Sequence, residues 1–145
     1  MECVIFIGIQ ASGKSTFYKQ RFFNTHIRIN LDMLKTRYRE NILVTACVEG
    51  KQPFVVDNTN PTSEERVKYI ESAKHSGFKV TGYYFEPCYE ESIIRNDERG
   101  GKEKVPQVAI KSTISKLQKP VIEEGFDELY KVRLVEGEFR VEEIC

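Results

Sequence analysis

Residues 8–15 have the types and the spacing that bind phosphate. They fit the pattern G-x-x-x-x-G-K-[ST], with glycines at positions 8 and 13. Glycines let the backbone wrap closely around an anion, and the loop N–H groups and the start of the next helix then point at phosphate oxygens. In such a loop Lys14 would reach the β- and γ-phosphates of a nucleotide, and the Ser15 hydroxyl would ligate Mg²⁺.

The sequence on each side predicts that this loop joins a strand to a helix. Residues 3–7 are apolar throughout, which is typical of a strand buried on both faces of a parallel sheet. Residues 16–22 contain no Gly or Pro and predict a helix. This context favours a phosphate-binding loop over a glycine-rich turn without a ligand. The expected nucleotide contacts are Gly8, Gln10, Ala11, Ser12, Gly13, Lys14, Ser15 and Thr16.

Asp57 ends a second apolar strand, predicted at residues 53–57. In phosphate-loop proteins an acid in this place holds Mg²⁺ through water or orients the loop serine, here Ser15. A cap of the following turn, with no metal role, is the alternative.

Asp32 is the acid whose position suggests a transfer reaction. It follows a short strand predicted at residues 26–30, and the helix that it begins carries Lys35 and Arg37. A kinase needs a group that accepts the proton of an acceptor hydroxyl, and a carboxylate beside basic groups suits a hydroxyl attached to an anion. The pattern is equally compatible with a plain helix N-cap.

Residues 95–104 form a basic, glycine-containing segment between two predicted helices. Arg95 and Arg99 are one helical turn apart, which predicts that they share a face. Arginines on a mobile loop can close on a triphosphate and stabilise charge on the transferring phosphoryl group. A solvated basic loop is the alternative.

Composition predicts one soluble domain over residues 1–145. Basic and acidic residues number 22 each, so there is no global basic field of the kind that a long nucleic-acid tract favours. Residues 14–39 nevertheless hold seven bases and one acid, which suits a local anionic substrate or simply a solvated face. The four cysteines lack metal-like spacing, and no apolar run approaches a membrane span. We expect a cytoplasmic protein without membrane contact.

The periodicity predicts an α/β fold. Helices are expected at residues 32–48, 62–76, 89–98 and 107–119, with further strands at 78–85, 127–134 and 139–141, the last two forming a C-terminal hairpin at about 127–142. Strands that alternate with helices predict a mostly parallel sheet covered on both faces, with ligands at the carboxyl ends of the strands. The loop, Asp32, Asp57 and Glu86 should therefore converge on one cleft.

Several motifs together resemble the kinase domain of polynucleotide 5′-hydroxyl kinases. They are the loop G-I-Q-A-S-G-K-S, N-L-D at residues 30–32, V-V-D-N-T-N-P at 55–61, R-N-D-E-R-G at 95–100 and V-P at 105–106. The resemblance covers roughly residues 3–120. It implies a P-loop kinase fold with a small lid at about residues 95–105. It also implies transfer of the γ-phosphate of ATP, with Mg²⁺, to the 5′-OH end of DNA or RNA.

The resemblance also implies roles for individual residues. Asp32 matches the general base, Lys14 and Ser15 match residues that bind phosphates and Mg²⁺, and Arg95 and Arg99 match lid arginines that contact the nucleotide phosphates. Asp57 is expected to join Ser15 at the metal. The residues expected to face the acceptor are Asp32, Lys35, Arg37, Asn58 and Asn60.

Two positions depart from the phage-type members of this family. Leu31 stands where they have an arginine, and Lys35 stands where an arginine grips the acceptor's terminal phosphate with a forked geometry. A lysine does not reproduce that fork. Either Arg37 takes over this contact or the acceptor differs.

The partners follow from the same resemblance. Relatives often carry a phosphatase or ligase domain, but residues 1–145 contain no D-x-D-G-[ST] motif, so this is a stand-alone kinase or an excised domain. Single-stranded ends are expected because no long basic stripe is visible for a duplex. Two other functions stay open: a kinase for a nucleoside, sugar or antibiotic hydroxyl, and a nucleotide-binding switch without transfer.

Overall fold

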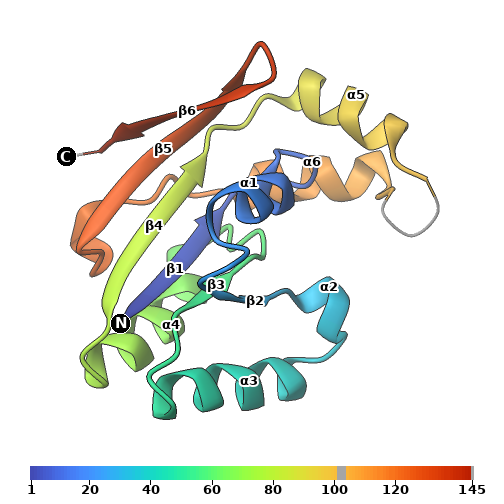
Figure 1. Cartoon of the computed structure of the whole chain (residues 1–145). Coiled ribbons are helices and arrows are strands. Elements are labelled where there is room, and N and C mark those ends of the chain that lie inside the picture. The colour runs from blue at the N-terminus through green and yellow to red at the C-terminus, as the bar shows by residue number, and fades with distance from the viewer. Residues whose placement is uncertain (101–103, 145) are drawn as a thin grey trace.

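The protein folds around a mostly parallel six-stranded sheet of order β2-β3-β1-β4-β5-β6 (Figure 1). The computed structural model describes residues 1–100 and 104–144. Only the β5–β6 pair is antiparallel among the described strand pairs. The strands are β1 Glu2–Ile7, β2 Ile27–Ile29, β3 Phe54–Val56, β4 Lys79–Phe85, β5 Glu128–Val135 and β6 Glu138–Glu143. The predicted α/β class is confirmed.

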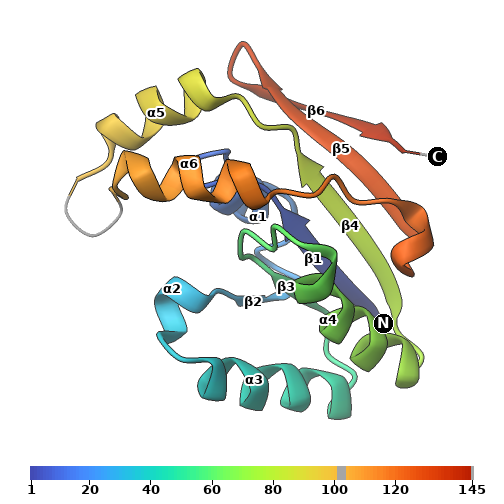
Figure 2. The same cartoon turned by 180° about the vertical axis from the view of Figure 1, so that it is seen from behind.

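Helices cover both faces of this sheet. They are α1 Lys14–Arg21, α2 Leu31–Leu34, α3 Arg37–Glu49, α4 Ser63–His75, α5 Tyr89–Glu98 and α6 Gln107–Lys116, with a 3₁₀ turn, η2, at Ile122–Glu124. Helix α1 lies on the face toward the viewer in Figure 1, and α4 and α6 lie on the opposite face, which Figure 2 shows from behind. None of the helices in the described part of the chain is long and apolar enough to cross a membrane.

Alternate residues of β1 contribute to two apolar cores. Cys3, Ile5 and Ile7 pack with α3 and α4, whereas Val4 and Phe6 pack with α1. Because both faces of this central strand are buried, its sequence is apolar at every position after Glu2, as a covered parallel strand requires.

The prediction of one helix at residues 32–48 is wrong in one respect, because the structure has two helices there, α2 and α3. Helix α2 ends at Lys35, whose φ of 75° lies in the left-handed region. The next residue, Thr36, caps α3, because its hydroxyl accepts a hydrogen bond from the Arg39 N–H at 3.2 Å. A threonine at an N-cap outweighs a periodic pattern that would otherwise run through it.

Candidate active site

The predicted phosphate-binding loop joins β1 to α1, at the carboxyl end of the central strand. A Cβ added to Gly8 would lie 2.8 Å from the Cβ of Phe85, so only glycine fits there. Gly13 has a φ of 98°, and a Cβ at this position would lie 3.0 Å from the Phe139 ring of β6. The predicted glycines are therefore required by close approach and by backbone conformation.

Lys14 lies folded back onto its own loop. Its Nζ donates hydrogen bonds to the carbonyl oxygens of Gly8 at 3.0 Å and Ile9 at 2.6 Å. Burial lowers the pKa of Lys14 to about 8, while Asp57 and Asp32 act to raise it and Arg99 acts to lower it. The structure thus places Asp32, Asp57 and Arg99 close enough to this ammonium for their charges to act on it.

Ser15 and Asp57 lie together, as predicted, and the Arg28 guanidinium contacts both side chains. The Ser15 hydroxyl donates to Asp57 Oδ2 at 3.2 Å. Arg28 of β2 donates from Nε to the same Oδ2 at 2.8 Å and from Nη2 to Ser15 Oγ at 2.9 Å. The Asp57 side chain is 1% exposed, and Arg28 forms an ion pair with it at 2.8 Å. The guanidinium is a stand-in cation, and the two oxygens that it contacts fit the proposed Mg²⁺ site.

Arg28 is a residue of this site that sequence reasoning missed. It lies in the middle of the three-residue strand β2, next to buried Ile29. The signal was its place in the alternating pattern, since a strand residue next to a core residue points to the opposite face of the sheet. That face carries α1 and the serine.

Asp32 lies in the first turn of α2, directly after β2, and is exposed. It is not the N-cap: that position belongs to Asn30, whose side-chain oxygen accepts from the Met33 N–H at 2.9 Å. The Asn30 amide also donates to the Asp57 carbonyl at 2.6 Å, which ties α2 to the end of β3. The capping alternative for Asp32 is therefore excluded, and its carboxylate is not used to start the helix.

The two predicted lid arginines, Arg95 and Arg99, lie near the C-terminal end of α5, and both are partly buried. Arg95 donates from Nε to the carbonyl oxygen of Ala11 at 2.6 Å, which brings α5 onto the phosphate loop. Arg99 is the C-cap of α5 (φ −75°, ψ 144°), so the chain leaves the helix after it, and a shared face with Arg95 stays a prediction. The predicted lid at 95–105 includes residues 101–103, which lie outside the described part of the chain.

Asn96, for which no role was predicted, joins the two ends of this segment. It is buried, and its side chain donates to the Val105 carbonyl at 2.6 Å and accepts from the Val105 N–H at 2.8 Å. This two-way contact joins the end of α5 to the chain that leads into α6.

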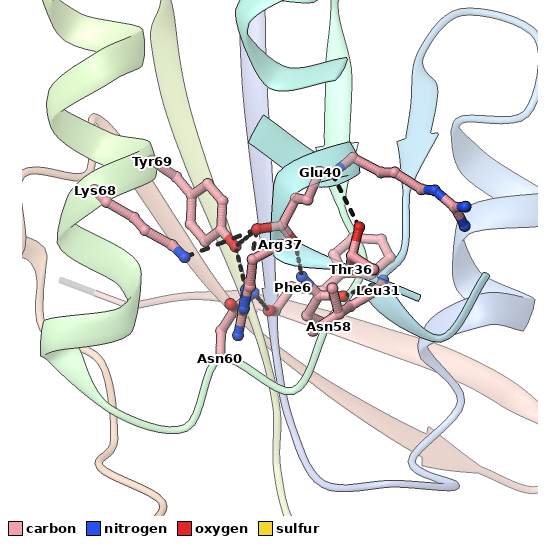
Figure 3. A network of polar contacts seen from close by, with 10 residues as sticks. Phe6, Leu31, Thr36, Arg37, Glu40, Asn58, Asn60, Lys68 and Tyr69 are labelled. Carbon is pink, nitrogen blue, oxygen red and sulfur yellow. Dashed lines mark hydrogen bonds and ion pairs between the residues drawn. The ribbon is translucent and has the colours of Figure 1, made fainter. Parts of the chain in front are cut away.

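The predicted acceptor residues separate into two groups, and Figure 3 shows three of them, Arg37, Asn58 and Asn60. Lys35 and Arg37 are exposed, and Arg37 Nη1 donates to Glu40 at 3.0 Å. The Asn58 side chain accepts from the Leu31 N–H at 2.8 Å, beside Asp32. Asn60 does not reach the cleft, because it is buried and donates to the Phe6 carbonyl at 2.8 Å. Its prediction as an acceptor contact is corrected to a structural role.

A cavity of about 340 Å³ lies on the other side of the loop from Asp32. Ser12 of the loop and Arg95 of α5 line it, together with Glu86 after β4 and Val135 at the end of β5. Because β2 and β4 lie on opposite sides of β1 in the sheet, the loop separates this cavity from Asp32.

Solved structures with this fold include nucleotide-binding proteins and a kinase. Chaetomium thermophilum Kti12 in complex with ADP-AlF3 has a TM-score of 0.68 and 14% identity, with 90% of this chain and 88% of that chain covered. A gluconokinase from Sinorhizobium meliloti 1021 has a TM-score of 0.61 and 18% identity, with 90% and 82% covered. These likenesses confirm the predicted P-loop kinase fold.

Two curated relatives confirm the resemblance to polynucleotide kinases. The bifunctional polynucleotide phosphatase/kinase of Schizosaccharomyces pombe is 29% identical over 135 residues, which cover 90% of this chain and 33% of the relative. A candidate bifunctional polynucleotide phosphatase/kinase of Acanthamoeba polyphaga mimivirus is 29% identical over 138 residues, with the same coverage. The chain therefore spans about a third of the length of the curated relatives it matches.

A family model matches a large part of the chain and identifies its family. The model described as the AAA domain matches residues 36–120, which make up more than half of the sequence. By that match the chain belongs to this AAA domain family, and its fold is that of the P-loop kinases.

Proposed function

We propose that this chain is an ATP-dependent kinase that transfers the γ-phosphate of ATP to the 5′-hydroxyl end of DNA or RNA. The observation that carries the proposal is the position of Asp32. Its carboxylate is exposed and does not cap α2, because Asn30 does so, and its negative charge acts to raise the pKa of Lys14 in the phosphate loop. The names of the two curated relatives support the polynucleotide acceptor.

ATP would occupy the loop and the cavity beside it. The phosphates would accept hydrogen bonds from the loop N–H groups and from Lys14, which would exchange its contacts with the loop carbonyls for phosphate oxygens. The nucleoside would enter the cavity near Ser12 and Arg95. Arg95 and Arg99 would then lie on the side from which charge on the transferring group is neutralised.

Mg²⁺ would be held directly by Ser15 and through water by Asp57. When bound, it neutralises the negative charge that develops between the β- and γ-phosphates. Arg28 contacts these two oxygens in the free protein, so its guanidinium would compete with a bound Mg²⁺ for them.

The transfer step needs a base on the acceptor side of the loop. Asp32 would accept the proton of the 5′-hydroxyl while the oxygen attacks the γ-phosphorus in line. The new O–P bond then forms as the bond to the bridging oxygen of ADP breaks. Arg37 and Lys35 would bind an anionic group of the acceptor next to the reacting hydroxyl. Lys35 cannot form a forked contact, whereas Arg37, with Nη1 held by Glu40, can offer one only from Nε and Nη2.

The acceptor and the protein context are part of the same proposal. Single-stranded ends suit a chain whose formal net charge is zero. The end of a DNA or RNA strand would approach Lys35 and Arg37, the residues proposed to bind the acceptor. The 145 residues would act as one kinase domain. A phosphatase or ligase domain is a fitting partner, since each relative's name includes a phosphatase. Free thiols at Cys3, Cys47 and Cys88 fit a cytoplasmic, reducing environment.

The test is transfer of label from γ-labelled ATP to DNA and RNA oligonucleotides with a 5′-hydroxyl. We expect Asp32→Ala to lower kcat by about 10²- to 10⁴-fold, the usual contribution of a general base, while ADP still binds. Lys14→Ala should abolish both transfer and tight ADP binding. Glu64→Gln, which changes an exposed acid in the first turn of α4, is the matched control and should leave transfer unchanged.

The outcomes separate the three functions. Transfer to nucleosides or sugars but not to oligonucleotides would instead identify a small-molecule kinase, for which the gluconokinase shows that this fold suffices. Nucleotide binding that survives Asp32→Ala, with no acceptor turned over by the wild-type protein, would identify a nucleotide-binding switch.

A further inference from the structure

Glu40 is a buried carboxylate near the acceptor side that the proposed mechanism does not use. It lies in the first turn of α3 and is 0% exposed. Its Oε1 accepts hydrogen bonds from the Tyr69 hydroxyl at 2.7 Å and Arg37 Nη1 at 3.0 Å. Its Oε2 accepts one from Asn58 Nδ2 at 2.9 Å, and the Lys68 ammonium lies 3.8 Å from Oε1 (Figure 3).

Such an arrangement is costly unless the carboxylate has a task. Burying a charge requires pairing and full hydrogen bonding, and an apolar side chain would fill the same space at lower cost. Burial raises the pKa of Glu40, but the hydrogen bonds from Tyr69, Arg37 and Asn58 outweigh it, so the pKa lies below its usual value. At neutral pH the group is therefore a carboxylate that only accepts hydrogen bonds.

Asn58 connects Glu40 to the backbone beside Asp32. Its Nδ2 donates to Glu40, and its Oδ1 accepts from the Leu31 N–H at 2.8 Å. Leu31 is the first residue of α2, and Asp32 follows it. The amide can accept from Leu31 only while its nitrogen faces an acceptor on the other side. Glu40 therefore determines the orientation of the Asn58 side-chain amide.

Arg37 forms the second branch of the network. Its Nη1 donates to the Tyr69 hydroxyl at 3.1 Å as well as to Glu40, which closes a triangle of three side chains. The Arg37 side chain nevertheless remains 48% accessible. Because a guanidinium is planar, holding one of its nitrogens restricts the directions of the other N–H donors.

We propose that Glu40 is the positioning residue of the acceptor side. It fixes both the guanidinium of Arg37, which binds an anionic group of the acceptor, and the backbone that carries the base Asp32. This inference rests on the proposed function, because it concerns the same site.

Glu40→Gln tests this role because it keeps the shape of the side chain and replaces one acceptor by a donor. If the glutamine oxygen faces Tyr69 and Arg37, its NH₂ group faces the NH₂ group of Asn58. Two donors cannot bond, so the Asn58 amide turns over and presents its nitrogen to the Leu31 N–H, which is again a donor. The predicted specific consequence is a lost hydrogen bond at Leu31.

The first measurement needs no substrate. Amide hydrogen exchange of the free protein, read by NMR, should be about tenfold faster at Leu31 in Glu40→Gln than in the wild type. Glu49→Gln, which changes an exposed acid at the end of the same helix, should leave Leu31 unchanged. Equal exchange at Leu31 in the wild type and Glu40→Gln would overturn the inference.

The second measurement is steady-state transfer to a 5′-OH oligonucleotide. Glu40→Gln should lower kcat by about 100-fold through misplacement of Asp32 and raise KM for the acceptor, with ADP affinity unchanged. Arg37→Ala should raise the acceptor KM with a smaller effect on kcat, and Glu40→Asp should restore part of the activity. Equal losses of transfer and ADP affinity would mean that Glu40 only supports the fold, and would overturn the inference.

A wild-type protein that transfers no phosphate would refute the proposed function separately. In that case Leu31 exchange still decides the connection to Glu40: faster exchange in Glu40→Gln supports it, and unchanged exchange overturns it.

Discussion

Removal of the Arg28 guanidinium should have opposite effects on the free protein and on metal-dependent nucleotide binding. In the free protein, Arg28→Ala leaves the buried Asp57 carboxylate without its cation. A buried pair broken at one partner costs about 3–5 kcal/mol and a surface pair under about 1 kcal/mol. Since the Arg28 side chain is 28% exposed, we expect an intermediate loss of about 2 kcal/mol in the free energy of unfolding. That loss corresponds to about 4–8 °C in Tm for a chain of this size.

The same two contacts oppose Mg²⁺ in the wild-type protein. Arg28 Nη2 occupies one of the two lone pairs of the Ser15 hydroxyl, and its positive charge would repel the ion. Arg28→Ala should therefore strengthen the Mg²⁺-dependent part of ADP binding, by about tenfold if 1.4 kcal/mol of the lost contact energy is recovered. The variant should also lose affinity for metal-free ADP, because a cation that offset the phosphate charge is gone.

Calorimetric titration of ADP at several Mg²⁺ concentrations, together with thermal unfolding, measures both effects. Arg140→Ala, at an exposed arginine of β6, is the control. The reasoning is refuted if Arg28→Ala and Arg140→Ala have the same Tm and the same Mg²⁺ dependence of ADP affinity.

Two further predictions concern buried charges. Burial lowers the pKa of Lys14 to about 8, so above that pH the folded protein loses the ammonium that binds phosphate. ADP affinity should fall by up to about tenfold per pH unit from pH 8 upward, and Lys14→Met should remove this dependence; an affinity that is flat with pH would contradict it. The unfolded chain keeps that proton to higher pH, so the stability contributed at Lys14 rises as pH increases from 8 toward the ordinary lysine pKa. Arg66 is 0% exposed and donates to both carboxylate oxygens of Glu124, at 2.8 and 3.1 Å, so Glu124→Ala should cost about 3–5 kcal/mol in urea unfolding, whereas Glu123→Ala next to it should cost under about 1 kcal/mol. Similar losses in the two variants would show that the buried pair contributes little.

Local patterns were sufficient to predict the elements that carry the loop. The glycines at 8 and 13 and the apolar run of β1 depend on neighbouring residues, and these predictions agree with the structure, whereas α1 begins at Lys14, two residues before the predicted helix. The alternation of strands and helices also predicted that the loop, Asp32, Asp57 and Glu86 would lie at the carboxyl ends of the strands, and the structure shows that the strands before Asp32 and Asp57 are adjacent.

Side-chain partners from distant segments could not be predicted in this way. Arg28 and Asp57 are 29 positions apart, as are Glu40 and Tyr69, and nothing in either local sequence specifies the other. Periodicity likewise gave no sign that Asn60 points into the core. The break at Lys35 was detectable in principle, because Thr36 is a strong capping residue, but the helical pattern around it concealed the signal.

The contact between Gly13 and Phe139 links the earliest functional motif of the chain to its last strand. The Phe139 ring packs against Phe17 of α1 with centroids 5.2 Å apart, so β6 covers the first turn of that helix. A shortened protein that stops before β6 would uncover this aromatic surface and loosen the turn that presents the phosphate ligands. Nucleotide affinity should therefore depend on a hairpin that contributes no ligand itself, and tags or fusion partners are best joined after residue 144, because Ile144 packs against the core and donates to the Leu129 carbonyl.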